Sequence, residues 1–415
     1  MSTITDFDIA TDLKTEFFLA GGGTNDFIIG VSRIGGVDVL AGAGIFYIGT
    51  SLIGGTDLLG GDDSGFEWTD LNCFTALAQV DIGGEVIDQL YFQPSPAGAS
   101  ITLQSLEYDP SYSPAFRPGV QVRLRLVKDA VDQVIWSGII DSISTGYSPD
   151  NESILQIRAL DSFKRLVNTR LPLVDTDTDF PEGFVSPYEQ LEVIAEQFGT
   201  AMHSSSVEPL GEIPSTILEN VIPSTLIYEA IQVGLGIFWI DPATREFVII
   251  PRPSPGDAIP EGAVVFSNDH ALEGHLCMTD IATSVSENTV YNSLKVTLSS
   301  DDAISTLRTN QDSIDLYGAY AQDVSLNTTD LTELNRWADE VFVQSPTSLV
   351  DSIETLTKDR LGNLTEAAFI LPGDKVGVKY NEGILEIDRY FTATKVSHYI
   401  DPDNWLTTLE VWKEA

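Results

Sequence analysis

The most regular pattern along the chain is a short alternation of hydrophobic and polar residues. In residues 120–127, Val122, Leu124 and Leu126 fall on one face, and a glutamine and two arginines fall on the other. A period of two is typical of a strand that buries one face. Comparable runs, rich in β-branched residues and bounded by Pro, Gly, Asp or Asn, predict strands at 101–110, 120–127, 134–144 and 153–160. Strands this short and evenly spaced are typical of a barrel or a sandwich.

A helical period replaces the alternation in the middle of the chain. Residues 186–199 carry helix signals at both ends, because Ser186 can cap the first turn and Pro187 suits the first helical position. Glu189 can complete a capping box, and Gly199 can end the helix. The apolar stripe predicted for this helix comprises Tyr188, Leu191, Ala195 and Phe198.

Two further helices are predicted, at 224–234 and at 329–343. The first precedes a predicted hairpin at 236–250, in which the turn DPATR separates GIFWI from EFVII. Strand-like sequence resumes after the second helix and ends with WLTTLEVWKE. The predicted buried face of the second helix comprises Leu331, Leu334, Ala338, Val341 and Phe342.

Residues 1–64 are rich in glycine and contain a 19-residue repeat, in which FIIGVSRIGGVDVLAG at 27–42 matches FYIGTSLIGGTDLLGG at 46–61. Short apolar runs divided by glycine pairs predict short strands and turns. Two copies are too few for a free-standing solenoid, so we expect an arm that packs against something else. The glycine pairs approach a calcium-binding repeat but lack its inner glycine, which favours structural turns.

Two turn signals recur in the same order in the two strand-rich parts. Pro118-Gly119 precedes one alternating strand, and Pro372-Gly373 precedes another, 254 residues later. The segment SPDNESILQI at 148–157 then aligns with DPDNWLTTLE at 401–410, 253 residues later. Such turn sequences are common, but their shared order and spacing favour a duplicated β-domain.

These patterns predict a mainly β fold that contains a duplicated antiparallel β-domain, either a barrel or a sandwich, and an inserted α+β domain. The predicted divisions are 1–64 for the Gly-rich arm, 65–170 for the first β-domain, 171–285 for the α+β domain, and 286–415 for the second β-domain with its inserted helix at 329–343.

The charge balance narrows the possible partners. Lysine plus arginine number 22 and aspartate plus glutamate number 62, which gives a net charge of −40. A negative electrostatic field repels nucleic acid and anionic lipid, so direct binding of DNA is not expected. Two explanations of the acidity stay open: adaptation to very high salt, where screening removes the self-repulsion, and a conduit that must not retain a passing polyanion.

Cysteines and apolar runs place further limits on the class of protein. Cys73 and Cys277 are the only cysteines, so no disulfide framework is expected. The acidic start lacks the basic n-region of a signal peptide, and no apolar run approaches the roughly 18 residues needed to cross a bilayer. We expect a soluble protein without an N-terminal export signal or a membrane anchor.

Four histidines provide the first candidates for site chemistry. His270, His275 and Cys277 lie close in sequence and could in principle ligate zinc, but their spacing matches no strong zinc pattern. We interpret them as loop or strand residues. His398, within KVSHYI, falls on one face of a predicted strand and is interpreted as a packing or interface residue. His203 carries no recognisable motif.

Carboxylates provide the other candidates. The acidic run DTDTD at 175–179 could bind a cation, but an exposed loop is the favoured interpretation. A glycosidase pair cannot be singled out among 62 acids. The sequence contains no nucleophile elbow, phosphate-binding loop or His-Glu-x-x-His motif. We therefore predict no catalytic, cofactor-binding or metal-binding residues, and no enzymatic activity.

The order of these elements resembles the tail hub proteins of siphovirus-like tailed viruses, the minor tail or baseplate-hub family. The resemblance covers about residues 65–415 and leaves the arm without a counterpart. No single segment is specific; their order carries the likeness. The segments are EYDPSYSPAFRPGVQVRLRL (107–126), WSGIIDSISTGY (136–147), ILQIRALDSFKRLVN (154–168), TLIYEAIQVGLGIFWID (225–241), SIDLYGAY (313–320), the helix at 329–343 and TATKVSHYIDPDNWLTTLEVW (392–412).

Such hubs are similar to the hub of contractile-tailed phages, in which each chain carries two tail-tube-like barrels and three chains make a ring of six. The resemblance implies a homotrimer at the tail tip or baseplate of a virion, and the acidity favours a haloarchaeal virus. Implied partners are a distal tail or tail tube protein, a tape measure protein and a tail fibre or spike, with DNA only in transit. The alternatives are a distal tail or fibre-adaptor ring protein, and an acidic secreted carbohydrate-active or carbohydrate-binding β-protein of a halophile.

Overall fold

The computed structural model describes most of the chain outside the Gly-rich arm. The repeat predicted at 27–42 and 46–61 lies outside the described residues, as do Cys73 and His270. The described residues are 7–20, 66–72, 75–87, 91–105, 108–110, 116–128, 131–147, 153–177, 180, 183–252, 259–269, 274–283, 292–342, 350–358, 363–382 and 385–412.

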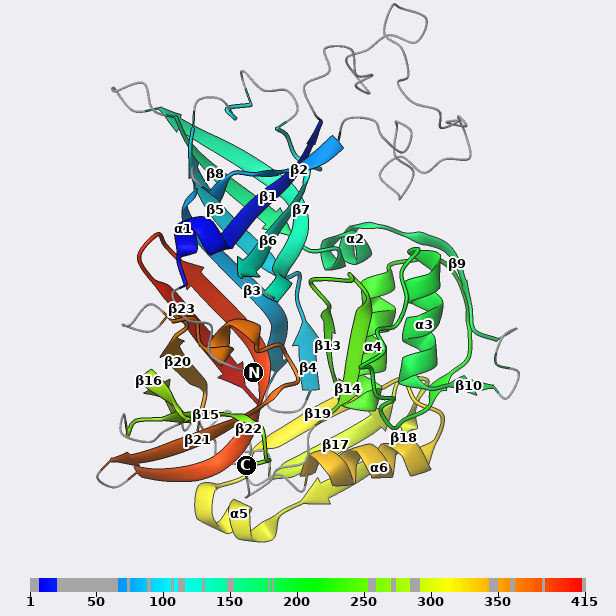
Figure 1. Cartoon of the computed structure of the whole chain (residues 1–415). Coiled ribbons are helices and arrows are strands. Elements are labelled where there is room, and N and C mark those ends of the chain that lie inside the picture. The colour runs from blue at the N-terminus through cyan, green and yellow to red at the C-terminus, as the bar shows by residue number, and fades with distance from the viewer. Residues whose placement is uncertain are drawn as a thin grey trace, which may run out of the picture.

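Strands dominate the described residues (Figure 1), as the alternating sequence predicts. The strands of the first half are β1 (Leu13–Ala20), β2 (Phe66–Asp70), β3 (Thr75–Ile87), β4 (Tyr91–Pro94), β5 (Gly98–Gln104), β6 (Gln121–Lys128), β7 (Val131–Tyr147), β8 (Ser153–Leu160), β9 (Leu171–Asp175), β10 (Phe184–Val185), β11 (Ile213–Pro214) and β12 (Ile217–Val221). Those of the second half are β13 (Gly236–Ile240), β14 (Phe247–Pro251), β15 (Val264–Ser267), β16 (Leu276–Ala282), β17 (Ser293–Leu298), β18 (Asp301–Thr309), β19 (Ala321–Leu326), β20 (Ser352–Leu356), β21 (Lys375–Glu382), β22 (Leu385–Ile400) and β23 (Trp405–Val411).

Helices are fewer and gather in the middle of the chain. They are α1 (Ile9–Asp12), α2 (Phe163–Asn168), α3 (Pro187–Gln197), α4 (Pro223–Gly234), α5 (Gln311–Tyr317), α6 (Leu331–Phe342) and the 3-10 helix η3 (Glu366–Phe369). Among the described helices, none is both long and apolar enough to cross a membrane.

One large sheet contains most strands of the two predicted barrels. Its hydrogen-bonded order is β2-β1-β6-β7-β8-β5-β3-β22-β21-β15-β16-β20-β23, and β22 also pairs with β23. That extra pairing closes six strands, β22-β21-β15-β16-β20-β23, into a barrel. Among the described residues, the strands from β2 to β3 form an open path instead. The mainly β prediction is thus confirmed, but the described residues form one closed barrel and not two separate ones.

Five strands of the open part repeat the hydrogen-bond register of five strands of the closed part. The first module is defined as β3, β5, β8, β7 and β6, and the second module as β16, β20, β23, β22 and β21. In both modules a bulge interrupts the pairing of the long strand: between Ile140 and Ser142 in β7, and between Ala393 and Lys395 in β22. A second shared bulge lies between Thr75 and Leu77 of β3 and between Met278 and Asp280 of β16.

The Pro-Gly turns carry the same hydrogen bonds in both modules. The amide of Gly119 donates to the carbonyl of Ile140 (2.8 Å), and that of Gly373 donates to the carbonyl of Ala393 (2.7 Å). In return, Ile140 donates to Val120 (2.8 Å), just as Ala393 donates to the residue after Gly373 (2.9 Å). Both glycines have a positive φ, 96° and 91°, which an L-residue with a side chain adopts only at a cost.

The observed register corrects the sequence alignment by one residue. Tyr147 pairs with Ser153 across the end of the first module, whereas Ile400 pairs with Trp405 across the end of the second. The connection is therefore one residue longer in the first module. As a result, residues of β8 correspond to residues of β23 that come 252 positions later in the sequence. The predicted offset of 253 aligns the turn sequences before these strands and not the strands themselves.

The strand beside β6 and β21 explains why only one part closes. β15 runs parallel to β21 and also parallel to β16, and so bridges the gap in the second module. β1 runs antiparallel to β6 and continues to β2 instead of reaching β3. β15 and β16 lie within the range predicted for the α+β domain, yet they pair with strands of the second module.

The middle part, residues 171–252, contains α3, α4 and the hairpin β13–β14, close to their predicted positions. The predicted capping box is present, since Ser186 accepts from the amide of Glu189 and Glu189 accepts from that of Ser186. Leu191 and Ala195 are buried as predicted, whereas Tyr188 is only half-buried. Phe198, the C-cap of α3, is also half-buried.

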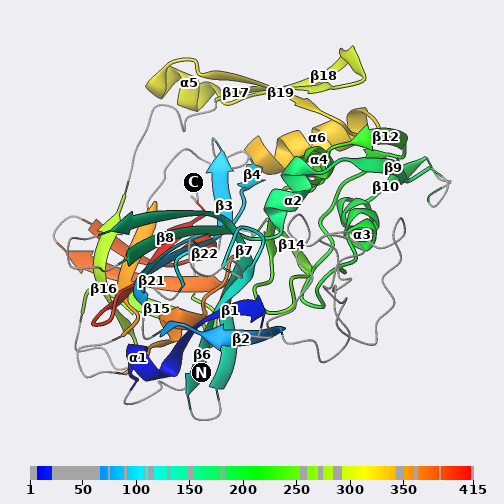
Figure 2. The same ribbon diagram turned by 90° about the horizontal axis from the view of Figure 1, so that it is seen from above.

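A separate three-stranded sheet, β18-β17-β19, lies within the range predicted for the second barrel. Figure 2 shows α6 between this sheet and α4. Leu334, Ala338 and Val341 of α6 are buried as predicted, but Leu331 is exposed. Trp337, absent from the predicted face, is buried and donates from Nε1 to the carbonyl of Gln232 (2.8 Å).

Candidate assembly interface

The two modules meet edge to edge along one antiparallel strand pair. Residues 78–83 of β3 pair with residues 395–400 of β22, and this pair is called the module junction. Val80 and Ile82 from the first module and Val396 from the second are buried on its inner face. On the other face, the Ser397 hydroxyl donates to Asp81 Oδ1 (2.6 Å). Backbone pairing thus joins the modules, and side-chain packing fixes its register.

Gly83 permits the close approach of the two backbones at the end of the module junction. Its φ is +100°, and a Cβ atom built there would overlap the carbonyl oxygen of Thr394. The same Cβ would lie 2.9 Å from Pro372 Cγ in the turn of the second module. Sequence analysis missed this residue, although a Gly-Gly pair inside an otherwise alternating strand is a signal of close backbone contact.

His398 is buried at the centre of the module junction, opposite Val80. Its Nδ1 lies 3.2 Å from the indole Nε1 of Trp405 and 2.8 Å from the Thr407 hydroxyl. The indole can only donate, so Nδ1 accepts and the ring proton is assigned to Nε2. Burial lowers the pKa of His398 to about 4. The ring is therefore neutral and serves as a hydrogen-bond acceptor within the interface.

The junction also borders the middle part. His398 and Ile82 line a small cavity of about 40 Å³ together with Pro242 of the β13–β14 turn and Leu371. The Ser137 hydroxyl of β7 donates to the carbonyl of Pro242 (2.6 Å). The middle part is thus fixed against the first module beside the junction, and it touches the second module at the same place.

The two Pro-Gly turns differ in what surrounds them. A Cβ atom at Gly373 would lie 2.6 Å from Ile250 Cδ1 and 2.9 Å from the Trp239 ring, both from the β13–β14 hairpin. At Gly119, by contrast, a Cβ atom would meet nothing within 4 Å. The hairpin of the middle part therefore packs closely on Gly373, whereas nothing lies within 4 Å of the equivalent Cβ position at Gly119.

This difference provides a matched pair of variants. We expect Gly119→Ala to lower the free energy of unfolding by about 1 kcal/mol, because only the positive φ is strained. Gly373→Ala should lose about 2 kcal/mol more, because the added methyl group also displaces Ile250 and Trp239. Denaturant unfolding measures both losses. Equal losses would contradict the packing of the hairpin on the turn.

Asp161 is a second buried titratable group near the junction. Its carboxylate accepts from the amide of Phe163 (3.1 Å), and its own amide donates to the carbonyl of Ala97 (2.9 Å). Burial raises the pKa of Asp161 to about 7. This residue belongs to the segment 154–168 that contributed to the family resemblance, and its carboxylate shapes the turn between β8 and α2.

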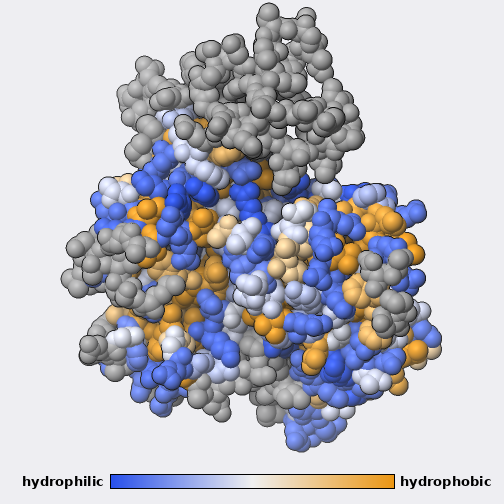
Figure 3. Space-filling view, turned by 45° about the vertical axis from the view of Figure 1, so that its right-hand side comes forward, coloured by the Kyte–Doolittle hydropathy of each residue, from blue (hydrophilic) through white to orange (hydrophobic). Residues whose placement is uncertain are grey.

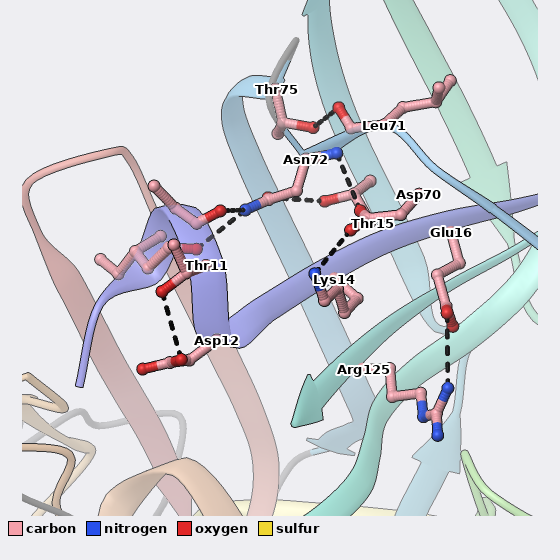
Figure 4. A network of polar contacts seen from close by, with 12 residues as sticks. Thr11, Asp12, Lys14, Thr15, Glu16, Asp70, Leu71, Asn72, Thr75 and Arg125 are labelled. Carbon is pink, nitrogen blue, oxygen red and sulfur yellow. Dashed lines mark hydrogen bonds and ion pairs between the residues drawn. The ribbon is translucent and has the colours of Figure 1, made fainter. Parts of the chain in front are cut away.

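Polar contacts hold the N-terminal strand on the first module (Figure 4). The Asn72 amide nitrogen donates to the carbonyls of Ile9 (2.8 Å) and Ala10 (3.1 Å), and the Thr15 hydroxyl donates to Asn72 Oδ1 (3.2 Å). The carboxylate of Glu16 pairs with Arg123 of β6 at 2.5 Å. Within the described start of the predicted arm, 7–20, β1 is therefore part of the sheet, and α1 precedes it.

The remaining sequence candidates that are described lie apart from one another. Among the described residues, no group of three or more His, Cys, Asp or Glu side chains could hold a metal ion. Cys277 is exposed on β16, and His203 Nδ1 lies 2.7 Å from the Ser205 hydroxyl. In the described part of 175–179, Asp177 accepts from Ser215 (3.0 Å), as in a structural turn.

Large apolar side chains are exposed outside the module junction. Figure 3 shows hydrophobic patches between wide hydrophilic areas on the face that it draws. The exposed apolar residues of the middle part are Leu173, Phe184, Val207, Leu210 and Ile217. The end of β7 carries another, Tyr147, which is 62% exposed.

Solved structures with a similar fold include two tail proteins. A tail protein from Neisseria meningitidis MC58 gives a TM-score of 0.57 at 13% sequence identity, over 84% of this chain and 94% of that chain. The 43 kDa tail protein of prophage MuSo2 from Shewanella oneidensis gives 0.53 at 11% identity, over 83% and 93%. No protein-family model and no curated protein sequence matches the chain. The likeness is one of fold, which this chain shares with these tail proteins.

Proposed function

We propose that this chain is a structural hub in the tail of a tailed virus, without enzymatic activity. The observation that carries the proposal is the register shared by the two modules, which includes two bulges and the Pro-Gly turns. A chain that contains two equivalent modules presents two equivalent surfaces. The shared fold with phage tail proteins supports a place in the tail.

Three such chains would display six equivalent modules around one axis. A homotrimer could then dock on a sixfold ring, such as a distal tail or tail tube protein, and bind threefold fibres or spikes on its other side. A tape measure protein would be a further partner, and DNA would pass through the central channel at the tail tip. A net charge of −40 would keep DNA phosphates from adhering to its wall.

The oligomeric mass separates this proposal from its rivals. We expect the purified protein in multimolar salt to have three times the chain mass of 45.1 kDa, because three chains complete a six-module ring. A hexamer would favour a distal tail or adaptor ring. A monomer that binds or cleaves polysaccharide would favour the acidic carbohydrate-active protein, and would contradict the hub.

Repeating the mass measurement after dialysis tests the origin of the acidity. We propose a virus of a salt-adapted host, with a haloarchaeon as the first candidate. At low salt the 62 acidic side chains repel one another without screening, so we expect the trimer to dissociate and the circular dichroism of its strands to be lost. A trimer that withstands dialysis would remove salt adaptation and leave the conduit explanation.

A further inference from the structure

We propose that residues 145–147, at the end of β7, pair antiparallel with residues 281–283 at the end of β16 in a second copy of this chain. The proposed pair copies the module junction between chains, with Thr145 opposite Thr283, Gly146 opposite Ala282, and Tyr147 opposite Ile281. The proposal rests on the trimeric hub proposed above and names the surfaces that would join its chains.

The positions follow from the register shared by the modules. Within the junction, His398 pairs with Val80, Tyr399 with Gln79, and Ile400 with Ala78. Residues 398–400 of β22 correspond to residues 145–147 of β7, because each segment forms the end of the long strand of its module, after the shared bulge. Likewise 78–79 of β3 correspond to 281–282 of β16, through the equivalent pairings with β5 and β20.

On one side of each segment, the described strands form no further backbone pairing. Residues 142–147 of β7 pair with β8 on one side, whereas β6 ends its pairing with β7 at Ile139. Residues 281–282 of β16 pair with β20 on one side, and β15 reaches only 276–277 on the other. In the module junction, the equivalent sides of β22 and β3 are occupied by each other.

The end of β7 is more exposed than the equivalent end of β22, as expected for a strand that has no neighbouring chain on that side. Val396, His398 and Ile400 of the junction are buried. Their counterparts in the first module are more exposed: Ile143 and Thr145 are half-buried, and Tyr147 is 62% exposed. A second chain on this edge would cover them as β3 covers β22.

The residues at the two edges are compatible when they are paired in this register. Tyr147 and Ile281 would form an aromatic and β-branched cross-strand pair, and Thr145 and Thr283 a threonine pair, both of which stabilise antiparallel strands. Gly146 and Ala282 are small and carry no charge. In a chain of net charge −40, three successive uncharged pairs avoid acidic repulsion across the interface.

The contact is head-to-tail, because β7 of one chain meets β16 of the next. Such a contact makes a closed ring if the rotation closes and an open filament if it does not. Closure after three chains places six modules in a ring, with the module junction and the proposed pair alternating around it. No copy of these two edges then stays exposed to unwanted strand pairing.

Disulfide trapping tests the pairing directly. In a background that carries Cys73→Ser and Cys277→Ser, the double variant Gly146→Cys, Ala282→Cys places cysteines at directly opposed positions. Opposed Cα atoms lie about 4.5 to 5.5 Å apart, within reach of a disulfide. We expect mild oxidation in multimolar salt to produce a covalent trimer on non-reducing electrophoresis, which reducing agent returns to a single chain.

The matched control moves one cysteine by two residues along the same face. Gly146→Cys with Asp280→Cys places the Cα atoms diagonally, roughly 7 to 8 Å apart, beyond efficient bridging. Ala282 and Asp280 are both exposed positions on β16. Under reducing conditions, both double-cysteine variants should have the mass of the parent oligomer, which would show that they assemble. We expect little cross-linking in the control.

The outcomes separate this pairing from the proposed function. If the reduced variants are trimers but neither pair cross-links, or if the control cross-links as well as the opposed pair, the pairing is wrong and the trimeric hub stands. If covalent species extend beyond three chains, the pairing is right and the closed trimer is wrong. Monomers in every sample would overturn both.

Discussion

The Gly83→Ala variant is expected to lose roughly 3 to 5 kcal/mol of unfolding free energy, the largest effect of any single methyl group considered for this chain. Two penalties add at this position. The φ of +100° is strained for alanine, and the new Cβ would overlap the Thr394 carbonyl oxygen, which belongs to the backbone and cannot turn away. The added methyl group would therefore force β3 and β22 apart at the end of the module junction.

Gly318→Ala is the matched control. Gly318 has a φ of +88°, and a Cβ atom there would meet nothing within 4 Å. We expect this variant to lose roughly 1 to 3 kcal/mol, the conformational penalty alone, because its ψ of 173° places it in a region that residues with side chains rarely adopt. Thermal or denaturant unfolding of both variants, in the same salt, gives the comparison. Similar losses for Gly83→Ala and Gly318→Ala would show that the two modules do not approach as closely as the structure places them.

Acid should weaken the junction through His398, by about 3 kcal/mol between pH 6.5 and pH 4. The pKa of this residue is about 4 in the folded protein, below its ordinary value of 6.5, because burial penalises the cation. As the pH falls through this range, the unfolded chain binds the proton first, so the folded state loses stability. Protonation would also place a donor at Nδ1 against the Trp405 indole, which can only donate.

Denaturant unfolding of the native chain and of His398→Gln, at pH 7 and at pH 4.5, tests whether protonation of His398 causes the loss of stability. Glutamine does not titrate, so we expect the variant to lose less stability on acidification than the native chain does. The difference between the two chains also cancels the change in surface charge that acid causes. Identical pH dependence in the two chains would contradict a buried, neutral His398.

Asp161 acts in the opposite direction in each chain, although its contribution cancels in the difference between them. The pKa of Asp161 is about 7 in the folded protein, compared with an ordinary value of 3.8. As the pH falls, the folded chain therefore binds this proton before the unfolded chain does. Its contribution to stability therefore rises as the pH falls from about 7 towards 3.8 and partly offsets the loss at His398. Measuring both chains in an Asp161→Asn background removes this offset from each of them.

Local signals in the sequence were sufficient for the elements that depend on neighbouring residues. Ser186, Pro187 and Glu189 predict the start of α3 because capping is a contact within one helical turn. Val122, Leu124 and Leu126 predict β6 because alternation places them on one buried face. The sequence predicts a strand at 101–110, whereas β5 begins and ends earlier, at Gly98–Gln104.

Pairing between distant strands could not be predicted in the same way. Nothing in the sequence near β16 indicates that it pairs with β20, which begins 70 residues after β16 ends. The parallel strand β15, which closes the barrel, has only four residues and no recognisable pattern. The Pro-Gly turns revealed the repeat, because a positive φ demands glycine, but only the observed register shows that five strands share it.

The residues of the module junction also differ in whether the local sequence indicates their role. The sequence favoured His398 as a packing or interface residue, because it lies on one face of an alternating run. It did not indicate Gly83, whose role depends on a carbonyl oxygen more than 300 residues away in the chain. Contacts of this kind become visible only when the two modules are placed side by side.

Electron cryomicroscopy of the purified oligomer, viewed along its symmetry axis, tests the central claim most directly. We predict three chains that form one ring of six like modules around an open channel, with module junctions alternating with contacts between chains. An oligomer in which the two modules of a chain lie at different radii or heights, so that no sixfold ring exists, would contradict the account.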